Sequence, residues 1–460
     1  MQPLVLLNTV GLTSRHLELA PRLSALARAG WHRPLIEVVP AVTCTAQASM
    51  LTGKLPQEHG IVGNGWLYRD TMEVRFWQQS NRLLQAEPLY VTAKRQAEAR
   101  GQQFRSAKLF WWFNQGAAVD IAVTPKPHYG ADGNKAFDIL SEPEPWAGRL
   151  KRAIGEFPFH TFWGPMAGLP SSQWIARAAA EVLRAEDGPP DLTLVYLPHL
   201  DYDTQRLGPE GCDWKKLVGE LDAACDPLLE AAKRVGARVW VVNEYAHVQV
   251  GRSVRLNAAL RHNGLLAARD GPFGEQLDTF GSPALAVCDH QIAHVYVREP
   301  RDVDAVLALK DFPGVGRVLA GEERREIGLA HSRAGDVVFL SKPDAWFEYR
   351  FWNEDSRAPD YARTVDIHRK PGYDPCELFV DPALLWPKVR FARRKLAKML
   401  GFRTLFDLTP LNAGLVRGSH GLPVTDPQDR PVLIGDGPPP ADAAISQCAV
   451  RDLVLQVLTV

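Results

Sequence analysis

A threonine hydroxyl stands where a helix is predicted to begin, a position suited to chemistry on phosphate. The segment Val39–Gln47 leaves an apolar strand, turns and opens a helix that Gly53 ends. Backbone N–H groups at a helix start lack intrahelical partners, and the helix dipole adds positive potential, so a phosphate is stabilised there. The Thr43 hydroxyl would face such an anion. A purely structural interpretation is also open, in which Thr43 or Thr45 only caps the helix.

The run Pro40–Asn64 around this threonine combines Leu51-Thr52-Gly53, Pro56 and Glu58-His59-Gly60-Ile61-Val62-Gly63-Asn64. This combination closely resembles the type I phosphodiesterase/nucleotide pyrophosphatase family of the alkaline phosphatase superfamily. In that family the threonine at this place attacks phosphorus, and the asparagine of the HGIxxN element binds a phosphate oxygen. The resemblance therefore implies that Thr43 is the catalytic nucleophile and that Asn64 binds substrate.

Segments further along the chain resemble the metal-binding elements of the same family. Asp201 matches a ligand aspartate, and His420 matches the last ligand histidine. Gln205 stands where the family has a second ligand histidine, and Glu244 and Tyr245 stand at an Asp-His ligand pair. The resemblance thus implies a metal site whose ligand set is depleted.

The first predicted strand adds one more candidate ligand. Asn8 lies two residues before Val10, which stands where the family carries its first aspartate. Because side chains alternate along a strand, Asn8 faces the same way as Val10. The expected metal ligands are therefore Asn8, Asp201, Gln205, Glu244 and His420, with Thr43 within reach.

This expected ligand set consists of oxygen donors and a single imidazole. Such a set suits Mg²⁺ or Mn²⁺ better than Zn²⁺, and we expect one or two divalent ions. Other residues could complete a nitrogen-containing set. His247 follows Glu244 closely, and Asp289 and His290 follow an apolar stretch, so we treat these three as less certain ligands. A structural role is open for each histidine.

The elements that must position these residues form an alternating pattern. Short apolar runs alternate with helical patterns over residues 1–250, which predicts a largely parallel central sheet with helices on both faces. Strands are predicted at Leu4–Val10, Leu35–Val39, Leu192–Leu197 and Arg238–Asn243, and a helix at Trp214–Val235. Ligands bind such sheets at the carboxyl ends of the strands. The resemblance implies an alkaline phosphatase-like α/β fold with inserted loops and a smaller cap.

Composition changes along the chain predict the domain organisation. Residues 1–300 and 405–460 are expected to form the catalytic core, and residues 301–404 a cap or insertion with many aromatic side chains. Within the core, residues 67–163 are dense in Trp, Phe, Pro and Gly, which predicts an insertion over the site.

The overall composition argues against a nucleic-acid partner and bears on where the protein is located. The 460 residues include 53 basic and 53 acidic side chains, so no global field favours nucleic acid. The six cysteines are dispersed without a CxxC pair, and no signal peptide or bilayer-spanning apolar run is recognisable. These features predict a cytoplasmic protein without a transmembrane segment. They leave its oligomeric state open.

Two basic segments remain. Lys388–Arg403 is amphipathic and carries seven Lys or Arg and no acid. We expect a helix packed on the core with a solvated basic face, and contact with anionic lipid is the alternative. Arg369 and Lys370 lie in the polar loop Thr364–Pro375, where they could hold an anionic group or form salt bridges.

Together these features predict a metal-dependent phosphoester hydrolase, a phosphodiesterase, nucleotide pyrophosphatase or phosphatase. It would act on a small phosphorylated substrate through Thr43 and a phosphorylated-enzyme intermediate. One alternative is a catalytically degenerate member that only binds a phosphorylated small molecule. Another is phosphoryl transfer or phosphonate cleavage on a sugar- or cyclitol-type substrate.

Overall fold

A nine-stranded sheet runs through the larger part of the molecule, in a computed structural model that describes residues 2–131, 135–402 and 404–459. Its strands are β1 (Leu4–Asn8), β2 (Trp31–Ile36), β5 (Ser106–Leu109), β6 (Ile121–Tyr129), β7 (Lys135–Glu142), β8 (Leu192–Tyr196), β9 (Arg238–Val242), β20 (Val432–Gly435) and β21 (Ile445–Ser446). Their order is β21-β2-β20-β9-β1-β8-β5-β6-β7. Pairing is parallel from β9 to β6, whereas β20 and β7 are antiparallel to their neighbours.

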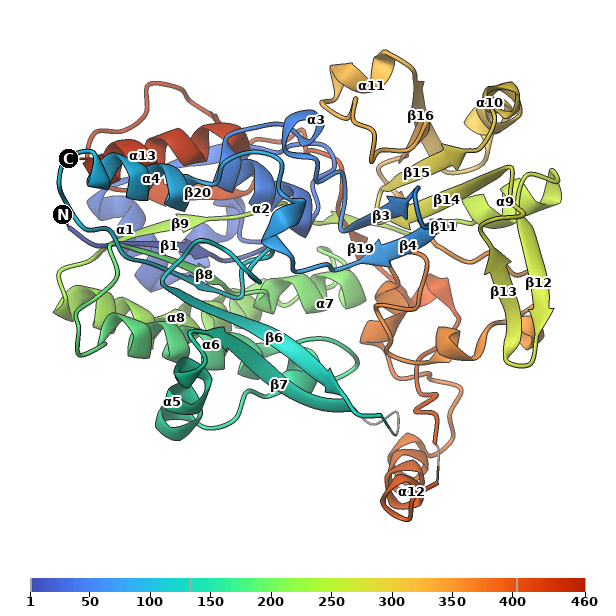
Figure 1. Ribbon diagram of the computed structural model, residues 1–460, viewed down its shortest axis with the longest axis horizontal. Coiled ribbons are helices and arrows are strands. Elements are labelled where there is room, and N and C mark those ends of the chain that lie inside the picture. The colour runs from blue at the N-terminus through green and yellow to red at the C-terminus, as the bar shows by residue number, and fades with distance from the viewer. Residues whose placement is uncertain (1, 132–134, 403, 460) are drawn as a thin grey trace.

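Helices cover both faces of this sheet (Figure 1). One face carries α2 (Thr43–Thr52), α4 (Leu89–Glu98) and α13 (Val450–Thr459). The other carries α1 (Pro21–Ala29), α5 (Pro145–Ile154), α6 (Leu169–Leu183), α7 (His199–Leu207) and α8 (Trp214–Arg234). All five residues of β1 and of β8 are buried, as expected for central strands covered on both faces. The expected α/β fold with a largely parallel, doubly covered sheet is confirmed.

A second hydrophobic core surrounds a four-stranded antiparallel sheet at the end of the molecule away from the two chain termini (Figure 1). In sheet order its strands are β14 (Ala284–Asp289), β15 (Ile292–Val297), β17 (Val337–Ser341) and β16 (Val315–Ala320). The short helices of this region and the segment before it are α3 (Pro56–His59), α9 (Leu256–His262), α10 (Val303–Leu307) and α11 (Glu323–Glu326). Four two-stranded pairs complete the described strands: β3 (Gly65–Tyr68) with β4 (Glu73–Phe76), β10 (Val248–Gln249) with β19 (Gly418–Ser419), β11 (Arg252–Val254) with β18 (Ala345–Phe347), and β12 (Ala267–Gly271) with β13 (Gly274–Asp278).

These units do not coincide with the residue ranges expected from composition. Strands β5 to β7 lie within the range 67–163 expected as an insertion, yet they extend the central sheet; residues 132–134 of that range lie outside the described residues. Strands β14 and β15 lie before residue 301, within the range assigned to the core, yet they belong to the smaller sheet. The two prolines within β6 weaken its period-two strand signal, which explains why composition alone assigned this segment to an insertion. The division into core and cap stays a prediction.

The basic segment forms α12 (Pro387–Met399), which projects from the body of the protein (Figure 1). None of its residues is buried, so the expectation of a helix packed on the core is wrong. Arg403, the last residue of the expected segment, lies outside the described residues. Among the described helices, none combines the length and the apolar character that crossing a bilayer requires.

Candidate active site

Thr43 is the first residue of α2, as the sequence predicted, and Gly53 ends the helix in a left-handed conformation with φ 68°. The Thr43 Oγ1 atom lies 3.0 Å from the hydroxyl oxygen of Tyr245. The Cys44 N–H, in the same first turn, donates to Asn64 Oδ1 over 3.0 Å. The start of α2 is therefore held from two sides, with the Thr43 hydroxyl turned toward the segment that follows β9.

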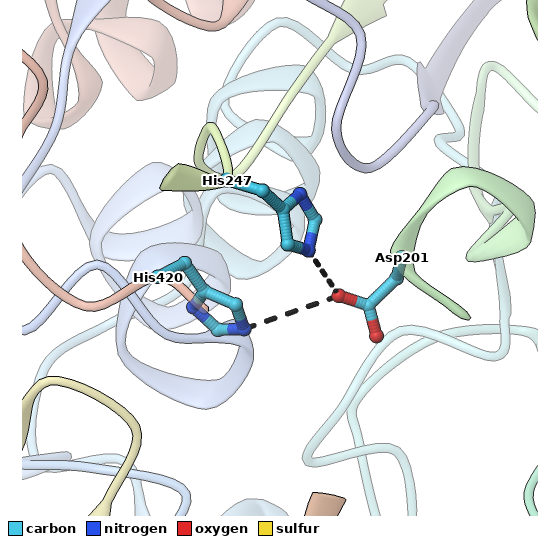
Figure 2. A group of neighbouring side chains, drawn as sticks. All are labelled: Asp201, His247 and His420. Atoms are coloured by element: carbon cyan, nitrogen blue, oxygen red, sulfur yellow. Dashed lines mark hydrogen bonds and ion pairs between the residues drawn. The ribbon is translucent and has the colours of Figure 1, made fainter. Parts of the chain in front are cut away.

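Three side chains converge near this hydroxyl: Asp201, His247 and His420 (Figure 2). Their ligand atoms all lie within 4.8 Å of one another. Asp201 Oδ1 is 2.9 Å from His247 Nε2 and 3.9 Å from His420 Nε2. His420 Nδ1–H donates to Ala41 O over 2.7 Å, which fixes the ring tautomer and leaves the Nε2 lone pair facing the carboxylate. One carboxylate and two imidazoles form a donor set that fits a divalent metal.

The three members of this group come from separate elements at one edge of the central sheet. Asp201 lies in the first turn of α7, which follows β8. His247 lies after β9, and His420 follows β19. Because β8 and β9 flank β1 in parallel, the segments that follow them leave the sheet at the same edge.

Further polar side chains hold Asp201 in place. Gln205 Nε2 donates to Asp201 Oδ2 over 2.9 Å, and the Tyr245 hydroxyl donates to Asp201 Oδ1 over 3.2 Å. The Tyr373 hydroxyl in turn donates to Gln205 Oε1 over 2.7 Å. Gln205 thus lies beside the three-residue group and orients its carboxylate.

Glu244 does not point into this group. Its Oε1 atom accepts hydrogen bonds from Asn8 Nδ2 over 2.6 Å and from Gln47 Nε2 over 2.5 Å. The expected convergence of Asp201, Glu244 and His420 on one cation is therefore not seen, because two amides bind the Glu244 carboxyl. His247 occupies the third place. Glu244 Oε2 and Asn8 Oδ1 are buried without a hydrogen-bond partner among the described residues.

The other candidates have separate contacts. Asp289 accepts from the Asn64 backbone N–H over 2.7 Å and from Asn64 Nδ2 over 3.1 Å, so it supports Asn64 and lies outside the three-residue group. The His290 ring stacks on that of Tyr373 with centroids 3.9 Å apart and lies tilted against that of His420 at 3.6 Å. The amide of Asn64 thus joins the start of α2 to Asp289, and its role in substrate binding stays a prediction.

The two carboxyl groups near Thr43 differ in protonation. Burial acts to raise the pKa of Asp201, but the hydrogen bonds with His247 and Gln205 and the attraction of the neighbouring imidazoles outweigh it and leave that pKa below its usual value. Burial raises the pKa of Glu244 to about 8, although the hydrogen bonds from Gln47 and Asn8 oppose it. Burial also lowers the pKa of His420 well below its usual value. At neutral pH the site therefore presents a charged Asp201, a neutral Glu244 and a neutral imidazole.

Sequence reasoning missed two residues of the site. Gln47 lies one helical turn after Thr43 on α2, and that spacing could have identified it. Tyr373 lies in the loop 364–375 that was singled out for Arg369 and Lys370. Lys370 is buried and paired with Asp374 at 2.7 Å and Glu377 at 2.8 Å, so it anchors the loop and is not free to hold a substrate anion.

The chain matches one known protein family in sequence. The model of the type I phosphodiesterase/nucleotide pyrophosphatase family matches residues 4–374. No curated protein matches the chain in sequence.

Solved structures share the fold at low sequence identity. Murine ectonucleotide pyrophosphatase/phosphodiesterase 5 is 14% identical with a TM-score of 0.59, covering 100% of this chain and 95% of its own. An inactive threonine-to-alanine variant of that protein was solved in complex with AMP, with the same identity, TM-score and coverage. Phosphonoacetate hydrolase from Sinorhizobium meliloti 1021, in complex with phosphonoformate, is 15% identical with a TM-score of 0.58, covering 99% of this chain and 95% of its own.

Proposed function

Because the chain belongs to the type I phosphodiesterase/nucleotide pyrophosphatase family, a family of phosphoric ester hydrolases, we propose that it hydrolyses a small phosphoester through Thr43. One observation carries this proposal. The Thr43 hydroxyl stands at the start of α2 and is linked through the Tyr245 hydroxyl to Asp201 of the candidate metal group. A nucleophile, an anion-stabilising helix start and a metal-type donor set thus meet at one place.

Three parts of the site act in the first step, the transfer of the phosphoryl group to the enzyme. Thr43 Oγ1 gives up its proton to water and attacks phosphorus, so that a Thr43 O–P bond forms as the bond to the leaving oxygen breaks, and the leaving oxygen takes up a proton from water. Since the Tyr245 hydroxyl donates to Asp201 Oδ1, it accepts the hydrogen bond from Thr43 and so orients the attacking oxygen. The start of α2 stabilises the charge on the non-bridging oxygens. In the second step water attacks phosphorus and loses a proton, the Thr43 O–P bond breaks as Thr43 Oγ1 takes up a proton, and the product leaves as phosphate from a monoester or as a phosphate monoester from a diester.

Asp201, His247 and His420 would hold one divalent metal ion, which when bound lowers the pKa of a coordinated hydroxyl and offsets phosphoryl charge. The preference for Mg²⁺ or Mn²⁺ rested on a single imidazole. Two imidazoles form a donor set that Zn²⁺ accepts as readily. We therefore propose one ion, with Zn²⁺ and Mn²⁺ as the candidates.

A second candidate function is binding without turnover. It is favoured by Glu244, whose carboxyl is bound by Asn8 and Gln47 where the family resemblance implies a metal ligand. A small phosphorylated ligand remains the proposed partner in both cases. The AMP and phosphonoformate complexes of the similar structures suggest nucleotide esters and phosphonates as the compounds to try.

The test measures turnover of an aryl phosphate monoester, an aryl phosphate diester and phosphonoacetate by the purified chain with Zn²⁺ or Mn²⁺. Thr43→Ala should lower kcat at least about 10³-fold, whereas Thr43→Ser, which keeps the hydroxyl, should retain measurable activity. Mass spectrometry of acid-quenched enzyme should find phosphate on Thr43. Equal activity of the alanine variant would refute the nucleophile, and AMP binding without turnover of any compound would establish the binding function instead.

A further inference from the structure

The projecting helix α12 has two faces with different surroundings. One face contacts the segment that returns to the body: Arg390 and Arg394 pair with Asp407, the latter at 3.2 Å, and the ring of Phe391 lies 5.6 Å from that of Phe406. These contacts fix the helix against its own return segment. They involve only one side of the helix.

The opposite face is apolar and exposed. Val389, Leu396, Met399 and Leu400 recur at helical spacing, so they share one side. Their exposed fractions are 62%, 57%, 76% and 67%. Leu385 and Trp386, just before the helix, are 90% and 74% exposed. An apolar face of this size on a projecting helix indicates a binding surface.

Cations border this apolar face. Lys388 and Lys395 lie along one edge of it and Arg393 along the other, at the positions that 100° per residue assigns. Neither these three nor Lys398 forms an ion pair with any residue that the structure describes, and residues 388–403 contain no Asp or Glu. Long basic side chains beside an apolar face can extend their charges to lipid phosphates while the face enters the acyl region.

We propose that α12 is a peripheral membrane anchor that binds an anionic bilayer surface, with its apolar face inserted and its flanking cations on the headgroups. Charge complementarity selects this occupant, because a bilayer offers both a continuous apolar layer and negative phosphates. The short length of the helix restricts it to lying in the interface. The inference does not depend on the reaction proposed for Thr43.

Co-sedimentation with vesicles tests the anchor. The full chain should sediment with vesicles of phosphatidylcholine and phosphatidylglycerol in equal parts, and not with phosphatidylcholine alone. The double variant Leu396→Glu, Met399→Glu should lose this binding at least about tenfold, as should Lys388→Glu, Lys395→Glu, since each cation contributes about fivefold. Both pairs are exposed, so folding should be unaffected, which circular dichroism and aryl phosphate turnover would verify.

Matched controls make the same changes elsewhere on the surface. Met166 is 61% exposed, and Lys215 and Lys310 are exposed as well, so Met166→Glu and Lys215→Glu, Lys310→Glu should leave vesicle binding unchanged. The proposed anchor is overturned if the chain does not bind anionic vesicles at low salt. It is equally overturned if the control variants and the α12 variants weaken vesicle binding to the same extent. It is also overturned if light scattering shows a dimer that Leu396→Glu, Met399→Glu dissociates, because a second copy would then cover the face.

Discussion

Asp201 and Glu244 are two buried carboxyl groups at the same edge of one sheet, and they have opposite properties. Asp201 is bonded to His247 and faces His420, and its pKa is lowered. Glu244 is bonded to the amides of Asn8 and Gln47, and its pKa is raised to about 8. Burial acts in the same direction on both, so the partners decide the charge. A position close to the nucleophile therefore does not make a carboxyl group a metal ligand; its hydrogen-bond partners decide whether it is charged.

The strongest test of this comparison replaces each carboxyl group by an amide of the same shape. Asp201→Asn should lower kcat/KM roughly 10²- to 10³-fold, because an amide cannot supply the anionic donor of the site. Glu244→Gln should change kcat/KM by less than about threefold below pH 8, because its carboxyl is already neutral there. Steady-state kinetics on an aryl phosphate would measure both. Similar losses in the two variants would show that Glu244 also takes part as an anion.

Metal affinity sharpens the comparison on the Asp201 side. Isothermal titration of chelator-treated protein should show one site for Zn²⁺ or Mn²⁺, and His247→Gln should weaken that site at least about tenfold. His262→Gln, on an exposed histidine of α9, is the matched control and should leave affinity unchanged. Glu244→Gln should likewise leave it unchanged. Loss of binding in Glu244→Gln with retention in His247→Gln would restore the originally expected ligand set.

The hydrogen bond from Tyr373 to Gln205 should have a smaller effect. Tyr373→Phe removes the hydroxyl that donates to Gln205, which in turn donates to Asp201. This loss should lower kcat/KM about two- to tenfold, the equivalent of about 0.5–1.5 kcal/mol. Tyr129→Phe, at an exposed position, serves as the control. An unchanged rate in Tyr373→Phe would mean that Gln205 orients Asp201 without help from this loop.

The smallest expected effect is on stability as a function of pH. The raised pKa of Glu244 means that the folded state keeps a proton which the unfolded state releases, so its contribution to stability falls as pH rises from about 5 to 8. Glu244→Gln in chelator should therefore show a Tm that declines less over this range, by several degrees, because about three pH units correspond to about 4 kcal/mol and a chain of this length shifts by roughly 1–2 °C per kcal/mol. Glu37, whose pKa burial also raises to about 8, keeps part of the slope. Parallel Tm curves for wild type and variant would contradict the neutral state of Glu244.

Local sequence patterns were sufficient to predict the framework of this protein. The strand, turn and helix around Thr43 rest on neighbouring residues, and the predicted helix start and the glycine that ends the helix match α2. The runs of apolar residues in β1 and β8 likewise predict central parallel strands. Asp201 and His420 were named from motifs, and both lie in the candidate metal group. The cytoplasmic location stays a prediction.

Only the tertiary structure decided which side chains face one another. Gln47 and Glu244 are 197 positions apart, and Tyr373 and Gln205 are 168 apart, so no local pattern could pair them. That pairing leaves Glu244 outside the group and brings in His247, whose nitrogen changes the metal preference. The same holds for α12, whose amphipathic pattern fits a packed helix and an exposed one equally well. Hydrophobic periodicity predicts that one face of a helix is apolar. Whether another element covers that face depends on the arrangement of the whole chain.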